Sequence, residues 1–195
     1  LLTARAWNEG GRALACWTAQ LIDREHAHPD AAVREDASEL MALLTPVVKA
    51  FLTDNGWETT TLCQQVLGGH GYIAEWGMDQ FVRDARINMI YEGTNGIQAL
   101  DLLGRKVLMD RGAKFGRFAA LVQATLAELQ GRAELAEFTA PLAKLLADTV
   151  ALTKEIGLRA QADPNEVGAA SVPFLRIIGH LCFAWLWARM AALAH

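Results

Sequence analysis

The sequence predicts an all-α protein, with an up-and-down helix bundle followed by an additional helical extension. Two observations favour this class: apolar residues recur at helical spacing along almost the whole chain, and no segment shows the alternation of a half-buried strand. Of the 195 residues, 52% are hydrophobic and 21% are charged. That composition is typical of a globular protein with enough apolar material to bury a core.

The first third of the chain predicts helices over 2–26, 33–53 and 57–67. In the second of these, Leu40, Leu43, Leu44 and Val47 repeat at intervals of three and four residues, which indicates an amphipathic helix. Pro46 is expected to kink it. Asp54-Asn55-Gly56 predicts a weak turn or bend before the third helix, which Gly68-Gly69 should end.

A glycine-rich loop over 68–77 leads to predicted helices over 78–90 and 94–109, joined by the loop Tyr91-Glu92-Gly93. The spacing predicts one inward stripe on each helix. The first stripe is Met78, Phe81, Val82, Ala85 and Met89, and the second is Ile97, Leu100, Gly104, Val107 and Leu108.

Asp110-Arg111-Gly112 predicts the boundary between a first domain, residues 1–110, and a C-terminal extension, residues 113–195. The extension is richer in Ala and Leu and predicts helices over 113–131, 139–161 and 172–194. The last helix has a continuous apolar stripe, which should be buried against the preceding helices or another subunit. The stripe consists of Phe174, Ile178, Leu181, Cys182 and Trp185.

Charge and hydropathy argue against two classes of partner. The net charge is −4, acidic residues alternate with Lys and Arg, and there is no basic tract, so no nucleic-acid partner is predicted. The most apolar segment, Leu181–Ala194, is interrupted by Arg189 and is shorter than the about 20 residues of a membrane-spanning helix. We therefore predict no membrane span.

Cysteine and histidine usage predicts neither a disulfide framework nor a metal site. Cys16, Cys63 and Cys182 are odd in number and widely spaced, which favours buried, reduced thiols and a cytoplasmic location. His26 and His28 flank a turn without a third ligand nearby, so a solvent-facing loop is expected there and the metal prediction is none.

Glu92 is the candidate catalytic residue. Most loop glutamates are simply solvated, but three neighbours favour a functional role here. Gly93 lets the backbone approach a ligand closely, and Thr94 can cap the following helix. The free N–H groups of Asn95 and Gly96 would then form an anion site suited to phosphate. The loop Gly68-Gly69-His70-Gly71 is a weaker signal, because no strand precedes it as in a dinucleotide-binding fingerprint.

Five segments in order, over about 34 residues, carry a resemblance to a known family: Gln65-Val66-Leu67-Gly68-Gly69, Gly71-Tyr72, Arg83-Asp84-Ala85-Arg86, Ile90-Tyr91-Glu92-Gly93-Thr94 and Gln98. Together they resemble the C-terminal helical domain of the acyl-CoA dehydrogenases. Residues 113–195 resemble the extension of the branch that includes enzymes similar to 3-methylmercaptopropionyl-CoA dehydrogenase. The chain opens on Leu1-Leu2 within a helical pattern, and we expect it to be a fragment of a longer protein.

The resemblance implies a mechanism and a site. Glu92 would abstract the α-proton of an acyl-CoA, a hydride would pass from the β-carbon to FAD, and the Glu92 backbone N–H would polarise the thioester carbonyl. Desolvation by substrate and flavin should strengthen the carboxylate as a base. Substrate-binding residues would be Tyr91, Glu92 and Gly93. Cofactor-binding residues would be Gln65, Val66, Leu67, Gly68 and Gly69, on a neighbouring subunit's FAD, together with Thr94, Asn95 and Gly96.

The implied partners are an acyl-CoA substrate, an electron acceptor such as electron-transfer flavoprotein, and further copies of the chain in a homodimer or dimer of dimers. The fragment alone is expected to be inactive, because most of the flavin and acyl-CoA site would lie in the missing domains. Two alternatives stay open at the level of sequence. One is an acyl-CoA oxidase, and the other is a helical assembly module without catalysis of its own.

Overall fold

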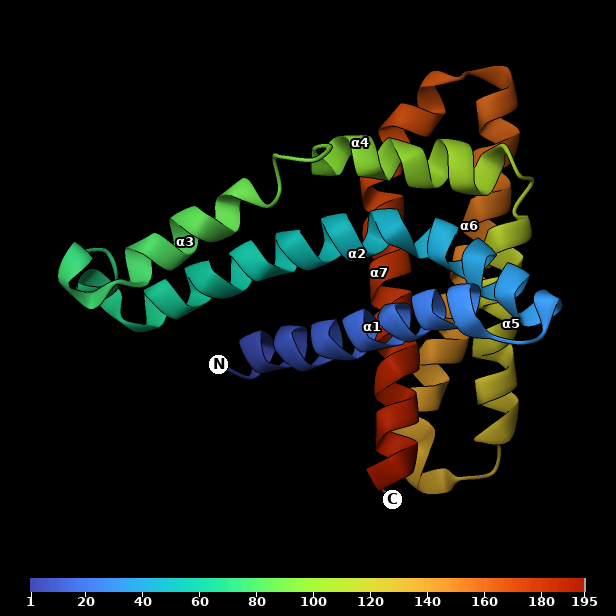
Figure 1. Ribbon diagram of the computed structural model, residues 1–195, viewed down its shortest axis with the longest axis horizontal. Helices are drawn as coiled ribbons and strands as arrows, with labels where there is room; N and C mark the ends of the chain where they lie inside the picture. Colours follow the sequence, from blue (N-terminus) through green and yellow to red (C-terminus); the bar gives the residue numbers. More distant parts are fainter. Residues whose placement is uncertain (195) are drawn as a thin grey trace.

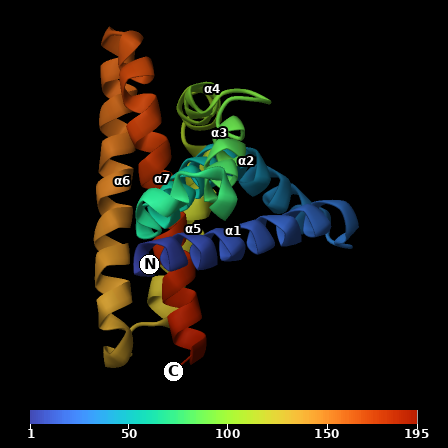
Figure 2. The same ribbon diagram turned by 90° about the vertical axis from the view of Figure 1, so that its left-hand side faces the viewer.

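The computed structural model describes residues 1–194, and all regular elements among them are helical, which confirms the predicted all-α class. Helix α2 (Ala31–Val66) lies between α1 (Leu2–Ala27) and α4 (Asn95–Leu100). Three further helices, α5 (Ala113–Glu128), α6 (Ala136–Ala162) and α7 (Asn165–Ala194), run alternately down, up and down across this layer (Figures 1 and 2). The position of the site described below depends on the packing between these two layers of helices.

Helix α2 is continuous through the segment where the sequence predicts a turn. The expected break at Asp54-Asn55-Gly56 is wrong, since one helix runs from Ala31 to Val66 and includes Pro46. Asn55 is buried, and Asp54 accepts a hydrogen bond from Asn95. Tertiary contacts on both faces of α2 therefore override the weak helix propensity of these residues.

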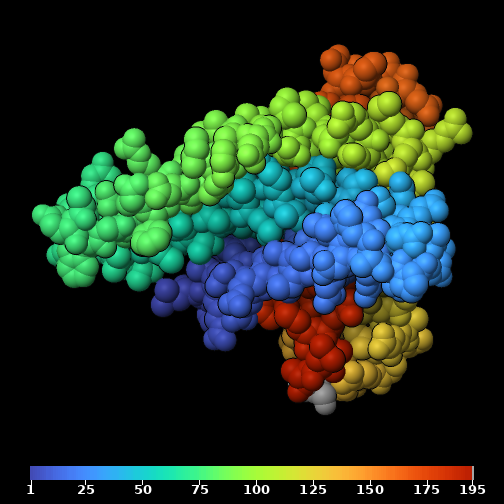
Figure 3. All heavy atoms as spheres, in the orientation of Figure 1, coloured from blue at the N-terminus to red at the C-terminus, as the bar shows by residue number. Residues whose placement is uncertain are grey.

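The C-terminal half of α2 forms one side of an arm that projects away from α5, α6 and α7 (Figures 1 and 3). Gly68, with φ 58°, ends α2 in the left-handed conformation as predicted. The chain returns through the short 3-10 helices η1 (Gly68–Gly71) and η2 (Ala74–Trp76) and through α3 (Met78–Ile87). Phe81, predicted to face inward, is instead 65% exposed, because α3 packs chiefly against α2 in this arm and leaves its other face open.

The predicted helix over 94–109 consists of α4 followed by a π-helix, η3 (Asp101–Leu108). The predicted inward face is partly wrong. Ile97 and Leu100 are exposed, whereas the buried residues are Ala99, Leu102, Leu103 and Val107. The i→i+5 bonding of a π-helix shifts the periodicity on which the 3.6-residue prediction depends, and the Asn95 contacts described below fix how α4 faces α2.

Helix α7 passes through the centre of the molecule at two contacts between a glycine and an aromatic ring. A Cβ at Gly179 would lie 2.4 Å from Cγ and Cδ2 of Phe51 on α2. A Cβ at Gly10 of α1 would lie 2.8 Å from Cδ2 of Phe183 on α7. Only glycine lets these helices approach so closely, and the Phe51 and Phe183 rings then pack edge to face with centroids 5.0 Å apart.

The length argument against a membrane span does not hold for α7. The helix begins at Asn165 rather than 172, and its 30 residues are long and apolar enough to cross a membrane by length and composition alone. The predicted stripe, from Phe174 through Ile178, Leu181 and Cys182 to Trp185, is buried in the protein core. Trp185 also donates a hydrogen bond of 2.8 Å from Nε1 to Thr125 Oγ1 of α5. This packing accounts for the apolar character of α7.

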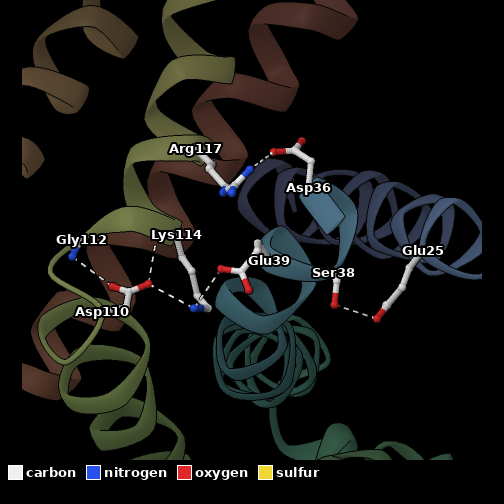
Figure 4. A network of polar contacts seen from close by, with 8 residues as sticks. All are labelled: Glu25, Asp36, Ser38, Glu39, Asp110, Gly112, Lys114 and Arg117. Carbon is white, nitrogen blue, oxygen red and sulfur yellow. Dashed lines mark hydrogen bonds and ion pairs between the residues drawn. The ribbon is translucent and has the colours of Figure 1, made fainter. Parts of the chain in front are cut away.

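Charged side chains join the start of α5 to α2 at the turn that the sequence predicts as a boundary (Figure 4). Asp110 accepts hydrogen bonds from the backbone N–H groups of Gly112 and Lys114. Lys114 Nζ lies 2.9 Å from Glu39 Oε2 and 3.2 Å from Asp110 Oδ2. The hydrogen bond that Lys114 donates to Glu39 is the main cause that raises the pKa of Lys114, and the hydrogen bond that it donates to Asp110 adds to it. The turn is thus tied to the first layer of helices.

The glycine contact in the core generates a stability prediction. Replacing Gly179 by Ala forces a methyl group against the Phe51 ring, and such overpacking should cost about 1–3 kcal/mol of unfolding free energy. Gly168→Ala is a matched control, because Gly168 lies on the same helix with nothing within 4 Å of a built Cβ. The control should stabilise by up to ~1 kcal/mol. Urea denaturation of both variants measures the difference, and equal midpoints would contradict the packing described here.

Candidate active site at the turn between α3 and α4

Glu92 occupies a left-handed turn between α3 and α4. Its φ is 53° and that of Gly93 is 86°. A non-glycine residue in this region is uncommon and persists only where its surroundings hold it. Below the turn, the Asn95 backbone N–H donates to the Met89 carbonyl at 3.1 Å, and the Tyr91 hydroxyl donates to Asn88 Oδ1 at 2.7 Å. The turn is therefore closed at its base and its tip presents Glu92.

The side chain of Asn95 fixes this turn to α2. Its Oδ1 accepts a 2.7 Å hydrogen bond from Lys49 Nζ. Its Nδ2 lies 2.6 Å from Asp54 Oδ1, 3.0 Å from Thr53 Oγ1 and 3.2 Å from the Ala50 carbonyl. Bonds to a charged amine and a charged carboxylate are stronger than neutral ones. The sequence did not link Lys49, Thr53 or Asp54 to the site, since they lie more than 40 residues from Asn95 in the chain.

The backbone conformation of Gly93 favours glycine at this position. A Cβ there would meet Gln98 Nε2 at 2.8 Å, and the positive φ disfavours any other side chain. The amide group of the Gln98 side chain therefore lies close to Gly93.

The Glu92 carboxylate is exposed, and no hydrogen bond or ion pair holds it within residues 1–194. The large apolar side chains around it in sequence are exposed as well: Ile90, Tyr91, Ile97 and Leu100. Most other exposed large apolar residues of this chain also lie between Leu62 and Leu100. The segment that carries Glu92 is therefore rich in exposed apolar side chains, which interaction sites often contain.

The predicted anion site at the start of α4 does not form as expected. Thr94 occupies the N-cap position, but its side chain makes no capping hydrogen bond. The Asn95 N–H is not free, because it donates to Met89. Gly96 remains exposed, with nothing within 4 Å of a built Cβ.

The second predicted cluster, Gln65 to Gly69, lies at the other end of α3 from Glu92 (Figure 1). All five residues are exposed at the tip of the arm. Gln64 Nε2 donates to the Gly71 carbonyl at 3.1 Å. A Cβ at Gly71 would lie 2.5 Å from the Gln64 carbonyl oxygen, so this glycine is needed for the turn itself. The structure thus separates the two predicted groups of cofactor residues by the length of α3.

The cysteine prediction is partly wrong, and His26 lies in α1 rather than in the predicted loop. Cys182 is buried, and burial raises the pKa of its thiol, whereas Cys16 is exposed. His26 Nδ1 contacts the Ile22 carbonyl, and His28 Nδ1 accepts from the Asp30 N–H. Among the described residues, no group of three or more His, Cys, Asp or Glu side chains is arranged to hold a metal ion.

Comparison with known proteins decides the family. Residues 8–108 match the model of the acyl-CoA dehydrogenase C-terminal domain, and residues 118–195 match the model described as acetyl-CoA dehydrogenase C-terminal like. The chain belongs to the acyl-CoA dehydrogenase family. It matches C-terminal domains of that family and spans about a third of the length of the two curated relatives described next.

Two acyl-CoA dehydrogenase relatives match almost the whole chain. A 3-methylmercaptopropionyl-CoA dehydrogenase of Ruegeria pomeroyi is 45% identical over 95% of this chain and 32% of its own length. The broad-specificity linear acyl-CoA dehydrogenase FadE5 of Mycobacterium tuberculosis is 35% identical over 100% of this chain and 33% of its own. The solved structure of Caenorhabditis elegans ACDH-11 in complex with C11-CoA matches 94% of this chain and 30% of that one, with a TM-score of 0.78 and 19% identity. At that identity the match shows the fold alone.

The brace beneath the acyl-CoA dehydrogenase turn gives a second prediction. Asn95→Ala removes the hydrogen bonds to Lys49 and Asp54 and leaves both charges without this partner, which should cost about 2 kcal/mol. Hydrogen exchange at the amides of residues 89–98 should accelerate selectively. Asn8→Ala is the control, because Asn8 is an exposed α1 residue and its loss should change stability by less than about 0.5 kcal/mol. Unchanged exchange in Asn95→Ala would show that the brace does not hold the turn.

Proposed function

We propose that a longer protein containing this chain is an FAD-dependent acyl-CoA dehydrogenase, and that Glu92 is the base that removes the substrate α-proton. The observation that carries the proposal is the position of Glu92. Its carboxylate is unpaired within residues 1–194, it lies on a left-handed turn braced from α2, and the large apolar residues nearest to it in sequence are exposed.

The surroundings suit a carboxylate that must act on a weak carbon acid. In water a glutamate is too weak a base for a thioester α-proton. Once the apolar surface around the turn is covered, the carboxylate loses water and gains strength as a base. The brace keeps its position fixed, which limits the entropy lost on reaching the reactive geometry. The Glu92 backbone N–H would donate to the thioester carbonyl and stabilise the developing enolate oxygen.

Two exposed glycines support cofactor binding by this chain. Gly69 and Gly96 have no positive φ and nothing within 4 Å of a built Cβ. No contact within the chain therefore requires glycine at either position, whereas close approach of an external group would. We assign Gln65, Val66, Leu67, Gly68 and Gly69, and separately Thr94, Asn95 and Gly96, as residues that contact FAD. When bound, FAD supplies the acceptor for the substrate β-hydride.

The distance between the two groups of proposed FAD-contacting residues favours an FAD site that two copies of the chain share. Because α3 lies between them, we propose that Gln65 to Gly69 serve the FAD of a neighbouring copy and that Thr94 to Gly96 serve their own. The protein would then be a homodimer or a dimer of dimers. Reducing equivalents would pass to an electron acceptor such as electron-transfer flavoprotein.

Glu92→Gln in the longer dehydrogenase tests the base directly. The variant should keep its FAD and bind acyl-CoA, but flavin bleaching on addition of acyl-CoA should slow by several orders of magnitude, because an amide cannot accept the proton. Glu75→Gln is the matched control, since Glu75 is an exposed carboxylate on the same arm. Bleaching within about tenfold of wild type in Glu92→Gln would reject the assignment.

A further inference from the structure

A long groove lies between η3, α5 and α6, at the far end of the α4–η3 helix from Glu92. Its volume is about 1160 Å³. It forms because α6 packs chiefly against α7 and only sparsely against α5. Helix α5 lines it from Gly112 to Gln123 and α6 from Val150 to Gln161. Each stretch is about 17 Å long at the α-helical rise, so the groove suits an elongated occupant.

The groove is lined by apolar side chains and by two helical glycines, at which a ligand can approach the backbone. Phe115 and Val107 are among its lining residues, and so is Leu158, which is 68% exposed. Gly116 and Gly157 also line it from within helices. A built Cβ at Gly116 meets nothing within 4 Å, and one at Gly157 meets only Leu108 at an ordinary 3.6 Å. Helix-interior glycine is unfavourable by about 1 kcal/mol relative to Ala, and no contact within the chain requires it at either position.

The charges at the groove have one sign. Its lining includes Arg105, Arg111 and Lys154 and no acidic residue, although the chain as a whole carries a net charge of −4. Arg105 pairs with Asp101. Arg111 and Lys154 have no ion pair within residues 1–194. An apolar groove beside unpaired cations is complementary to an amphipathic anion.

We propose that this groove binds a long aliphatic chain with an anionic head group, with the chain against Gly116 and Gly157 and the head beside Lys154. The site is separate from the proposed active site. The α4–η3 helix runs about nine residues, or roughly 13 Å, from Asn95 to Gly104, the first residue of this helix that lines the groove. A free fatty carboxylate and a fatty acyl-CoA share the required chemistry, and the experiment distinguishes them.

The test measures binding of cis-parinarate, a fluorescent long-chain carboxylate, to the 195-residue chain below the micellar concentration of each ligand. Hexadecanoate, hexadecanoyl-CoA and hexadecanol are then used as competitors. Both anions, or one of them, should displace the probe, and the better competitor identifies the source. Hexadecanol should compete about fivefold less well, because it lacks the ion pair. Equal competition by hexadecanol, or no probe binding, would overturn the proposal.

Matched variants locate the ligand. Gly116→Phe fills the groove and should weaken binding by about tenfold or more, since each displaced methylene contributes roughly a factor of four. Gly56→Phe is its control, because Gly56 is a helical glycine outside the groove with nothing within 4 Å of a built Cβ. Lys154→Glu should weaken binding about fivefold, whereas Lys144→Glu, on the same helix and paired with Asp148, should not.

Two results would assign the groove differently. Equal affinities of Gly116→Phe and Gly56→Phe would place the ligand elsewhere on the chain. A chain that is dimeric in sedimentation and becomes monomeric in Gly116→Phe would make the groove an interface between copies. Either result overturns the binding site proposed here.

Discussion

A segment of about one and a half turns of α2, from Lys49 to Asp54, contacts α7 on one face and the start of α4 on another. On one face Phe51 packs against Gly179, at a distance that only glycine permits. On another face Lys49, Thr53 and Asp54 hold Asn95. The C-terminal helix and the turn that carries Glu92 are therefore seated on the same short segment. The position of Glu92 therefore depends on the packing of α7 against α2.

This arrangement assigns a physical role to the C-terminal extension. The extension provides α7, whose buried face completes a core that α1 and α2 alone would leave open. The turn at Asp110 and the ion pairs Lys114–Glu39 and Arg117–Asp36 add polar contacts between partly exposed side chains, and such ion pairs contribute little. Burial of the α7 stripe, rather than charge pairing, therefore stabilises the crossing of the two layers.

Sequence predictions are confirmed where neighbouring residues in the chain determine the structure. Helical periodicity gives the class, Gly68 ends α2 as predicted, and the Tyr91-to-Thr94 segment marks the turn that carries Glu92. Predictions failed where distant residues decide. The break at Asn55 is absent because that residue is buried between helices, and the inward face of α4 is set by Asn95 and the π-helix that follows. No sequence signal linked Lys49 to Asn95, and the close contact of Gly179 with Phe51 appears only in three dimensions.

The central claim is that the Glu92 carboxylate removes the substrate α-proton, and proton exchange measures that step apart from the redox step. The longer dehydrogenase is incubated anaerobically in D₂O with a saturated acyl-CoA, and mass spectrometry of the recovered thioester reports deuterium at the α-carbon. Wild type should introduce deuterium, and Glu92→Gln should leave the α-carbon unlabelled although it retains FAD. Labelling by Glu92→Gln at the wild-type rate would contradict the account, because another group would then be the base.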